Sequence, residues 1–334
     1  MRKLKVAQIG TSVFEHSFQV FQSMLTQDDL FDVVGFANVD RHDGPLQKVF
    51  QNHHEMTPEE ILAIPDLDAI VIECDEKLQT HYALLAAQRN LPMHLEKPCG
   101  DDGEAFDRLI DEVEARNLVF HTGYMYRYNP AVQRTLELVR SGKLGEIYSV
   151  EAQMNCMHNV STRQWYKEFT GGQMFVLGCH LIDLICQIQG DPQSITPLNM
   201  SVENDGLCGE DFGMALLHYP NGISLAKTTA VEPGGYLRRQ LNVCGTKGTI
   251  EIRPLERGVA PEVVETEMTE IYADENGACP WGKEPVRTKF EPFNRYDAMM
   301  RAFGEMVQGK RVNPWTPEYE RKLHRMVLEA CGKK

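Results

Sequence analysis

The first 121 residues alternate short apolar segments with segments of helical spacing, and this alternation limits the fold more than any other feature of the sequence. Large apolar residues recur three or four positions apart between residues 14 and 25, which predicts a helix. Thr57-Pro58-Glu59-Glu60 is a capping box with proline at the first helical position, so another helix begins there. Strands that alternate with helices at this spacing form βαβ units on a parallel sheet. The expected strands cover residues 3–10, 31–39, 69–72, 91–95 and 118–121.

The rhythm of the sequence changes after about residue 145. Apolar and polar residues alternate over 147–154, which predicts a strand with one solvent-exposed face. Two hairpins are expected, at 214–225 and 241–252. We therefore expect an α/β domain over residues 1–121 and an α+β domain with a large, mainly antiparallel open sheet over 122–334. Further helices are expected at 178–189 and 317–330, the last with room to pack back on the first domain, and residues 256–291 are expected to wander over the surface.

Charge and composition exclude several classes of protein. The 334 residues carry a formal charge of -14, which argues against a nucleic-acid binder and against binding to anionic membranes. No apolar run approaches the roughly 18 residues of a spanning helix, and the N-terminus lacks the apolar region of a signal peptide. The nine cysteines are scattered without CxxC pairs, which is typical of a reducing compartment, so we expect the cytoplasm.

Ligands of a parallel α/β sheet bind at the carboxyl ends of its strands. That rule selects a small set of polar positions as candidates for a site. They are Gly10, Asp40, Glu73-Cys74-Asp75, Glu96-Lys97-Pro98 and the segment from Tyr124 to Arg127.

Six short motifs, in one order along the chain, resemble a known family. They are Asp68-Ala69-Ile70-Val71-Ile72, Glu96-Lys97-Pro98, residues 123–130 (GYMYRYNP), 141–147 (SGKLGEI), 178–183 (GCHLID) and 245–250 (GTKGTI). The chain is similar in these segments, which span most of its length, to the glucose–fructose oxidoreductase / inositol dehydrogenase / MocA family. The resemblance implies a Rossmann-type dinucleotide-binding domain and an NAD(P)-dependent dehydrogenase that acts on a hydroxyl of a sugar, inositol or related polyol. It also implies a homodimer or homotetramer.

By this resemblance, Lys97 is the catalytic base and His180 its helper, as proton relay or substrate contact. Alcohol oxidation removes a proton from oxygen as hydride leaves carbon, and a lysine whose pKa is tuned from about 10.4 toward 7–8 can accept that proton. The alternatives are a surface lysine before a proline and a histidine that only hydrogen-bonds within the fold. Asp183, one turn after His180, either orients the imidazole or caps the helix.

The resemblance also assigns binding residues. Asp40 ends the second strand, where this fold binds the adenosine ribose, and its carboxylate favours NAD, whereas Arg41 keeps NADP as an alternative. The expected cofactor set is Gly10, Thr11, Ser12, Asp40, Arg41, Cys74, Asp75, Glu96, Lys97, Tyr124 and Arg127. The expected substrate set is Lys97, Arg127, Trp165, His180, Asp183 and Tyr236; for Trp165, Tyr236 and the nearby His158, packing in the core or rim is the alternative.

The sequence departs from the family at three places. The glycine-rich turn, which binds the pyrophosphate in the family, keeps only Gly10, and Glu15 replaces its third glycine. A carboxylate about 4 Å from a phosphate would weaken binding of the cofactor by roughly 4 kcal/mol at an effective dielectric near 20. Glu73-Cys74-Asp75 stands where relatives carry Ala-Thr-Pro. Val176 occupies the position of the usual catalytic aspartate, and valine cannot move a proton or hold an imidazole tautomer.

These departures leave two alternative functions open. One is a sugar lyase or glycosidase that uses NAD without net redox change, and the other is a non-catalytic family member that binds a sugar or nucleotide. A metal site made of Glu73, Asp75 and His180 is conceivable, but no helical histidine spacing supports it, and no metal is expected.

Overall fold

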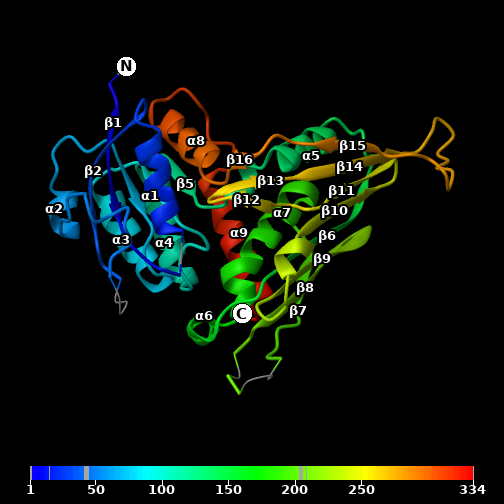
Figure 1. The fold of residues 1–334 in the computed structure, drawn as a ribbon, viewed down its shortest axis with the longest axis horizontal. Helices are drawn as coiled ribbons and strands as arrows, with labels where there is room; N and C mark the ends of the chain where they lie inside the picture. Colours follow the sequence, from blue (N-terminus) through cyan, green and yellow to red (C-terminus); the bar gives the residue numbers. More distant parts are fainter. Residues whose placement is uncertain (1, 15, 41–44, 203–205, 208, 334) are drawn as a thin grey trace. The chain divides into compact units, whose positions relative to one another are not determined.

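Five parallel strands form the sheet of the first unit of the computed structural model, in the order β2-β1-β3-β4-β5. Figure 1 labels β1, β2 and β5 of this sheet. The structure describes residues 2–14, 16–40, 45–202, 206–207 and 209–333. β3, β4 and β5 are buried along their whole length, which suits strands with helices on both faces of a sheet. The predicted parallel sheet is confirmed. Its strands are β1 (Leu4–Ile9), β2 (Phe31–Ala37), β3 (Ala69–Ile72), β4 (Met93–Leu95) and β5 (Phe120–Thr122).

The helices between these strands begin close to the predicted positions. The Thr57 side chain accepts from the backbone N–H of Glu60, and the Glu60 carboxylate accepts from that of Thr57, so the capping box is confirmed. The first helix begins at Ser17, which leaves Phe14 outside it and makes the predicted start too early. These helices are α1 (Ser17–Thr26), α2 (Pro58–Leu62), α3 (Glu76–Gln88) and α4 (Gly103–Ala115).

One helix and the first half of another, both from the end of the chain, complete the first unit, which comprises Met1–Met125 and Tyr296–His324. In α8 (Asp297–Val307), Asp297 accepts from the Ser23 hydroxyl at 2.7 Å and from the Gln27 amide at 3.0 Å, which ties α8 to α1. In α9 (Pro317–Ala330), Arg321 pairs with Asp111 of α4 at 2.7 Å. The sequence reasoning predicted α9 and missed α8.

An eight-stranded sheet dominates the second unit, which comprises Tyr126–Arg295 and Arg325–Lys334. The strand order is β15-β14-β11-β10-β6-β9-β8-β7, and every neighbouring pair is antiparallel except β6 and β9. Both predicted hairpins, β8–β9 and β10–β11, and the mainly antiparallel sheet are confirmed. The strands are β6 (Ile147–Asn155), β7 (Ser194–Pro197), β8 (Phe212–Tyr219), β9 (Gly222–Thr229), β10 (Gln240–Gly245), β11 (Gly248–Ile252), β14 (Glu267–Tyr272) and β15 (Val286–Lys289).

The prediction that residues 256–291 wander over the surface is wrong. β14 pairs with β11 from Met268 to Tyr272, and Met268 and Glu270 are buried between less buried neighbours. The same segment contributes to a three-stranded sheet of β12 (Arg257–Ala260), β13 (Val263–Glu265) and β16 (Phe293–Asn294). Proline, glycine and charge in the flanking turns hid these strands.

The remaining elements of the second unit are helical. α7 is buried along most of its length and is preceded by a π-helical turn, Met174–Gly178. The other elements are α5 (Pro130–Arg140), α6 (Val160–Tyr166), α7 (Cys179–Gln189) and 3₁₀ turns at Met125–Tyr128 and Gly235–Arg238. The division into domains 1–121 and 122–334 stays a prediction about independently folding parts of the chain.

Candidate active site

The loop after β1 packs directly on the loop after β3. Gly10 has a φ of 111°, and a Cβ atom at this position would lie 2.2 Å from the backbone nitrogen of Cys74. Only glycine fits both the conformation and the space. This close approach of two backbones explains why the first glycine of the family turn is retained here.

Asp40 fastens this pair of loops together. Its carboxylate accepts from the backbone N–H of Thr11 at 2.5 Å and from that of Asp75 at 2.7 Å, and the residue is 9% exposed. The expected contact of Asp40 with ribose hydroxyls therefore competes with these bonds inside the protein. Arg41, the expected neighbour for a 2′-phosphate, and Glu15 lie outside the described residues.

The two hydroxyls of the turn donate within the protein. The Thr11 hydroxyl donates to Asn38 at 2.8 Å, and the Ser12 hydroxyl donates to the Asp75 carboxylate at 2.5 Å. The expected role of these hydroxyls as phosphate donors therefore competes with internal bonds. α1 offers another anion site, because its N-terminus carries no side-chain cap and no acidic residue in its first turn.

Cys74 contributes a buried side chain. The thiol is 0% exposed and packs in the hydrophobic core of the first unit. Burial, reinforced by the nearby Asp40 carboxylate, raises the pKa of this thiol well above its usual range, so it stays protonated. A cofactor would contact Cys74 through its backbone and not through its thiol.

Lys97 lies directly after β4 with its side chain 3% exposed. Its Nζ is 3.5 Å from Oε1 of Glu96, which is equally buried. A Cβ at Gly123, after β5, would lie 2.2 Å from the Glu96 carboxylate, so glycine at that position makes room for the acid. Tyr124 follows and is 2% exposed. The Glu-Lys-Pro segment thus holds a buried cation and a buried carboxylate at the carboxyl end of the sheet.

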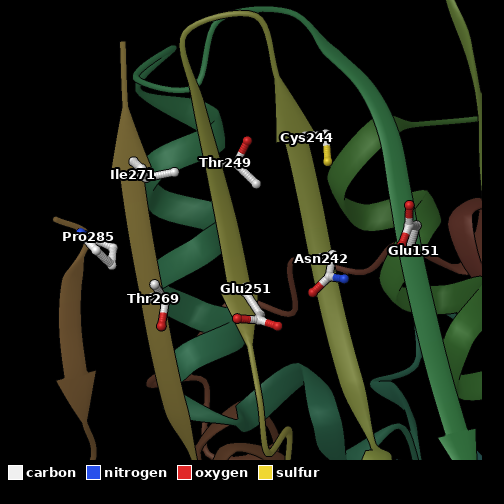
Figure 2. A pocket seen from close by; sticks show the side chains of 8 residues that line it. All are labelled: Glu151, Asn242, Cys244, Thr249, Glu251, Thr269, Ile271 and Pro285. Atoms are coloured by element: carbon white, nitrogen blue, oxygen red, sulfur yellow. The ribbon is translucent and has the colours of Figure 1, made fainter. Parts of the chain in front are cut away.

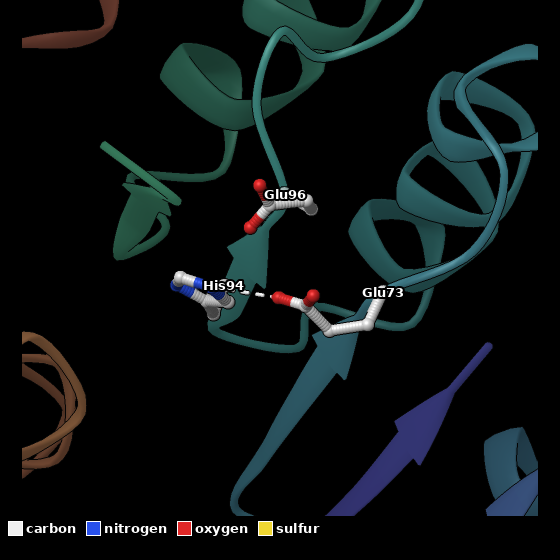
Figure 3. Close-up of side chains that lie close together, drawn as sticks. All are labelled: Glu73, His94 and Glu96. Atoms are coloured by element: carbon white, nitrogen blue, oxygen red, sulfur yellow. Dashed lines mark hydrogen bonds and ion pairs between the residues drawn. The ribbon is translucent and has the colours of Figure 1, made fainter. Parts of the chain in front are cut away.

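Next to this pair, Glu73, His94 and Glu96 converge with ligand atoms within 4.8 Å of one another (Figure 3). His94 Nε2 is 3.1 Å from Oε1 of Glu73, and His94 Nδ1 is 2.7 Å from Nδ1 of His121. Sequence reasoning missed both histidines because they stand inside apolar strands. The signal was their position, in register on neighbouring strands β4 and β5.

In the second unit, Arg127 and Asp183 form a buried ion pair. Nε of Arg127 lies 3.2 and 3.1 Å from the two carboxylate oxygens of Asp183, and Nη2 of Arg127 lies 2.9 Å from Oδ1. Both side chains are 1% exposed. Asp183 also accepts from the Gln187 amide at 2.7 Å. Because α7 begins at Cys179, Asp183 does not cap the helix, and that alternative is wrong.

His180 lies one turn before Asp183 and is 1% exposed. Its ring packs edge-to-face on Tyr126, with ring centroids 5.0 Å apart. The Tyr126 hydroxyl donates to Glu256 at 2.6 Å, and burial followed by the Glu256 charge raises the pKa of Tyr126 to about 12. Tyr126 is therefore a neutral donor that links His180 to Glu256. Val176, at the usual aspartate position, lies in the π-helical turn, a feature common at functional sites.

The other expected substrate residues differ in exposure. Trp165 is 7% exposed and packs against Tyr166 and Phe169, at centroid distances of 5.6 and 5.3 Å, as a core residue would. Tyr236 is 54% exposed and lines a cavity of about 240 Å³ together with Glu256 and Arg295. Lys97 belongs to the first unit and His180 to the second, so their cooperation stays a proposal.

Two family models match the chain. The oxidoreductase family's NAD-binding Rossmann fold matches residues 4–124, and its C-terminal alpha/beta domain matches residues 136–319. The chain belongs to the Gfo/Idh/MocA oxidoreductase family. The predicted family, its NAD-binding domain and its class of enzyme are confirmed.

Curated relatives and solved structures agree with this Gfo/Idh/MocA assignment. The chain is 24% identical to D-xylose 1-dehydrogenase (NADP(+)) 2 of Haloferax volcanii over 75% of its own length and 73% of the relative's. It is 24% identical to a trans-1,2-dihydrobenzene-1,2-diol dehydrogenase of Bos taurus over 64% and 60%. The fold matches aldose-aldose oxidoreductase from Caulobacter crescentus with a TM-score of 0.76, at 17% identity, over 99% and 98% of the two chains.

The residues of this Gfo/Idh/MocA member fit a dinucleotide. The close packing at Gly10 admits no side chain, Asp40 places a carboxylate beside the loop that contains Thr11, and the N-terminus of α1 has no side-chain cap. Among the described residues, no helix is long and apolar enough to cross a membrane.

Proposed function

We propose that this chain is an NAD(P)-dependent oxidoreductase that acts on a hydroxyl of a sugar, inositol or related polyol. The observation that supports it best is Lys97, a buried amine held 3.5 Å from Glu96 at the end of β4 in the NAD-binding domain. The sugar class is supported by relatives that are named a D-xylose dehydrogenase and an inositol 2-dehydrogenase. NAD is the proposed cofactor, with NADP as the alternative.

The bound nicotinamide would supply the hydride acceptor. Lys97, as a neutral amine, would take the proton of the substrate hydroxyl, and Glu96 would stabilise the ammonium that results. His180 would assist by hydrogen-bonding the substrate, with its ring held in place by Tyr126. Gly10, Asp40 and the start of α1 would hold the dinucleotide, and Thr11, Ser12, Asp75 and Tyr124 are proposed to line it.

The buried Arg127–Asp183 pair supports a structural role for both residues in this proposal. The pair fixes the 3₁₀ turn that contains Arg127 to α7, and so positions the segment that carries His180. Tyr236 is exposed beside its cavity, and we retain it as a proposed substrate contact. The packing of Trp165 favours the alternative that this residue belongs to the core.

The experiment is a panel of aldoses, inositols and polyols assayed with NAD and with NADP by nicotinamide absorbance. Turnover that Lys97→Met abolishes supports the proposal. Turnover of a glycoside without net change in absorbance would instead favour the sugar lyase or glycosidase alternative. No turnover on any member of the panel, with both cofactors bound, would contradict the proposal.

A second candidate function is ligand binding without redox chemistry. One observation favours it: the Thr11 amide and the hydroxyls of Thr11 and Ser12 already bond within the protein. The melting temperature measured with NAD and with NADP separates the two functions. A cofactor at one hundred times its dissociation constant adds about 2.7 kcal/mol of stability, so no shift with either cofactor would favour this candidate.

Assembly into a homodimer or homotetramer is also proposed. The eight-stranded sheet has an open face with a hollow of about 370 Å³, shown in Figure 2, whose lining includes Glu151, Asn242 and Glu251. Three apolar residues elsewhere on this sheet are well exposed: Tyr148 at 44%, Ile223 at 50% and Val286 at 59%. Light scattering that gives a 38.0 kDa particle would contradict assembly.

A further inference from the structure

Three titratable side chains form a continuous buried contact chain across neighbouring strands of the first unit. Glu73 follows β3, His94 lies in β4 and His121 lies in β5, and all are at most 1% exposed. The contacts are 3.1 Å from Glu73 Oε1 to His94 Nε2 and 2.7 Å from His94 Nδ1 to His121 Nδ1. We call these residues the Glu73–His94–His121 chain.

The tautomers along this chain depend on one another. Burial lowers the pKa of His94 to about 3, so its ring is neutral at pH 7 and carries one N–H. If Glu73 is ionised, His94 Nε2–H donates to it, and His94 Nδ1 accepts from His121 Nδ1–H. If Glu73 is protonated, its O–H donates to His94 Nε2, and His94 Nδ1–H donates to a bare His121 Nδ1.

The second arrangement holds one proton more than the first. A proton added at His121 Nε2 is balanced by transfer of the Nδ1–H of His121 to His94 Nδ1 and of the Nε2–H of His94 to Glu73. Both rings remain neutral, and the carboxylate charge disappears. The chain therefore stores one proton and changes its net charge from negative to neutral.

Glu96 connects this charge to Lys97. The ligand atoms of Glu96, Glu73 and His94 lie within 4.8 Å of one another (Figure 3), and Glu96 Oε1 is 3.5 Å from Lys97 Nζ. Each negative charge near Lys97 stabilises its ammonium form. A proton on Glu73 removes one such charge, so the ammonium form of Lys97 is held less strongly.

Two helices from the end of the sequence pack against this chain of residues. From α9, Glu320 accepts from Thr122, the residue after His121, at 2.9 Å. Phe303 of α8 stacks on His121 at a centroid distance of 5.5 Å and adds no charge. Glu96 Oε1 is already 3.5 Å from Lys97 Nζ, so a divalent metal would have to compete with Lys97 for this carboxylate.

We propose that Glu73, His94 and His121 share protons and that the charge of this Glu73–His94–His121 chain, added to that of Glu96, sets the protonation of Lys97. These are positioning residues, because they act through Lys97. The kinetic part of the proposal rests on the proposed function of Lys97 as the base, whereas the proton sharing does not.

The first test follows protons without turnover. NMR of ¹⁵N-histidine and of ¹³Cε-lysine is recorded from pH 5 to 10 on the full chain, with signals assigned from His94→Gln, His121→Asn and Lys97→Met. Glu73→Gln is expected to change the nitrogen shifts of both rings and to lower the titration midpoint of Lys97. The shift expected is about one pH unit, the effect of one charge roughly 10 Å away at an effective dielectric near 20.

Glu76→Gln is the matched control, because Glu76 is an equally buried carboxylate in the first turn of α3. It should leave the His121 shifts and the Lys97 midpoint unchanged. Two rings that titrate independently, or a Lys97 midpoint that Glu73→Gln does not move, would overturn the proposal. If Glu73→Gln does not fold, His121→Asn serves as the second variant and must change the shifts of His94 and the Lys97 midpoint.

The second test uses turnover. The rise of kcat/KM with pH, which reports loss of the Lys97 proton, should move about one unit lower in Glu73→Gln. If no sugar or polyol turns over, the proposed function fails while the NMR result still decides the proton sharing. A stoichiometric divalent metal in the purified protein, lost in His94→Gln, would identify a metal site and overturn the proposal.

Discussion

The Arg127–Asp183 pair provides the sharpest test of what holds the second unit together. Asp183→Asn keeps the size of the side chain and its contact with Gln187 but removes the negative charge. The guanidinium that faces it is 1% exposed, so water cannot replace the carboxylate. Charge centres about 4 Å apart attract by about 4 kcal/mol at an effective dielectric near 20, and breaking a buried pair typically costs about 3–5 kcal/mol. We expect a loss of that size.

The assay is urea unfolding, followed by tryptophan fluorescence and by circular dichroism, because Trp165 reports on the second unit. The matched control is Glu137→Gln, which breaks the exposed Arg134–Glu137 pair of α5 and should cost less than about 1 kcal/mol. The double variant Arg127→Met/Asp183→Leu replaces the charges by apolar groups and should recover much of the loss.

The outcome that refutes this reasoning is specific. If Asp183→Asn costs no more than Glu137→Gln, the buried pair does not hold the 3₁₀ turn to α7. If the double variant is as unstable as Asp183→Asn, the cost comes from lost shape and not from an uncompensated guanidinium.

Three further predictions follow from the first unit. Gly10→Ala should cost about 2–4 kcal/mol in urea unfolding, because backbone strain adds to the overlap of the new Cβ with Cys74. Gly142→Ala, at φ 70° with no atom near its Cβ, has the strain alone and should cost about 1–2 kcal/mol. Equal costs would contradict the close packing at Gly10. Lys97→Met should lower kcat/KM by about 10²–10⁴ at unchanged cofactor affinity in calorimetry, and full activity would exclude Lys97 as the base. His94 is neutral in the folded protein, so it should contribute stability above about pH 6.5 that is lost as the pH falls toward 3. The free energy of unfolding should fall by up to about 1.4 kcal/mol per pH unit in this range. The same slope in His94→Phe would contradict this.

Local patterns were sufficient for most of the elements. The parallel strands are short apolar runs between helices, the capping box contains its own hydrogen bonds, and both hairpins have glycine in or beside their turns. The segment that was missed, β14, has the period-two alternation of a strand, but its flanks are rich in proline, glycine and charge. The composition of the residues beside β14 indicated a loop, although the alternation within β14 correctly indicated a strand.

The partners within the site were beyond sequence reasoning. The rule for parallel sheets selected Asp40 and Lys97, but it gave no sign that Asp40 would accept two backbone amides. His94 contacts residues 21 positions before it and 27 after it, and only the register of three strands brings these together. Pairings of this kind depend on sheet geometry, which periodicity does not encode.

The contribution of α8 and the first half of α9 to the first unit has a consequence for how the chain is made. Ser23 of α1 and Gln27, which follows this helix, acquire their partner only when Asp297 has been synthesised. A nascent chain that stops near residue 121 leaves these residues open to water or to a chaperone. The nucleotide-binding half, although encoded first, is completed almost last on the ribosome, and fragments that omit residues 296–324 should aggregate.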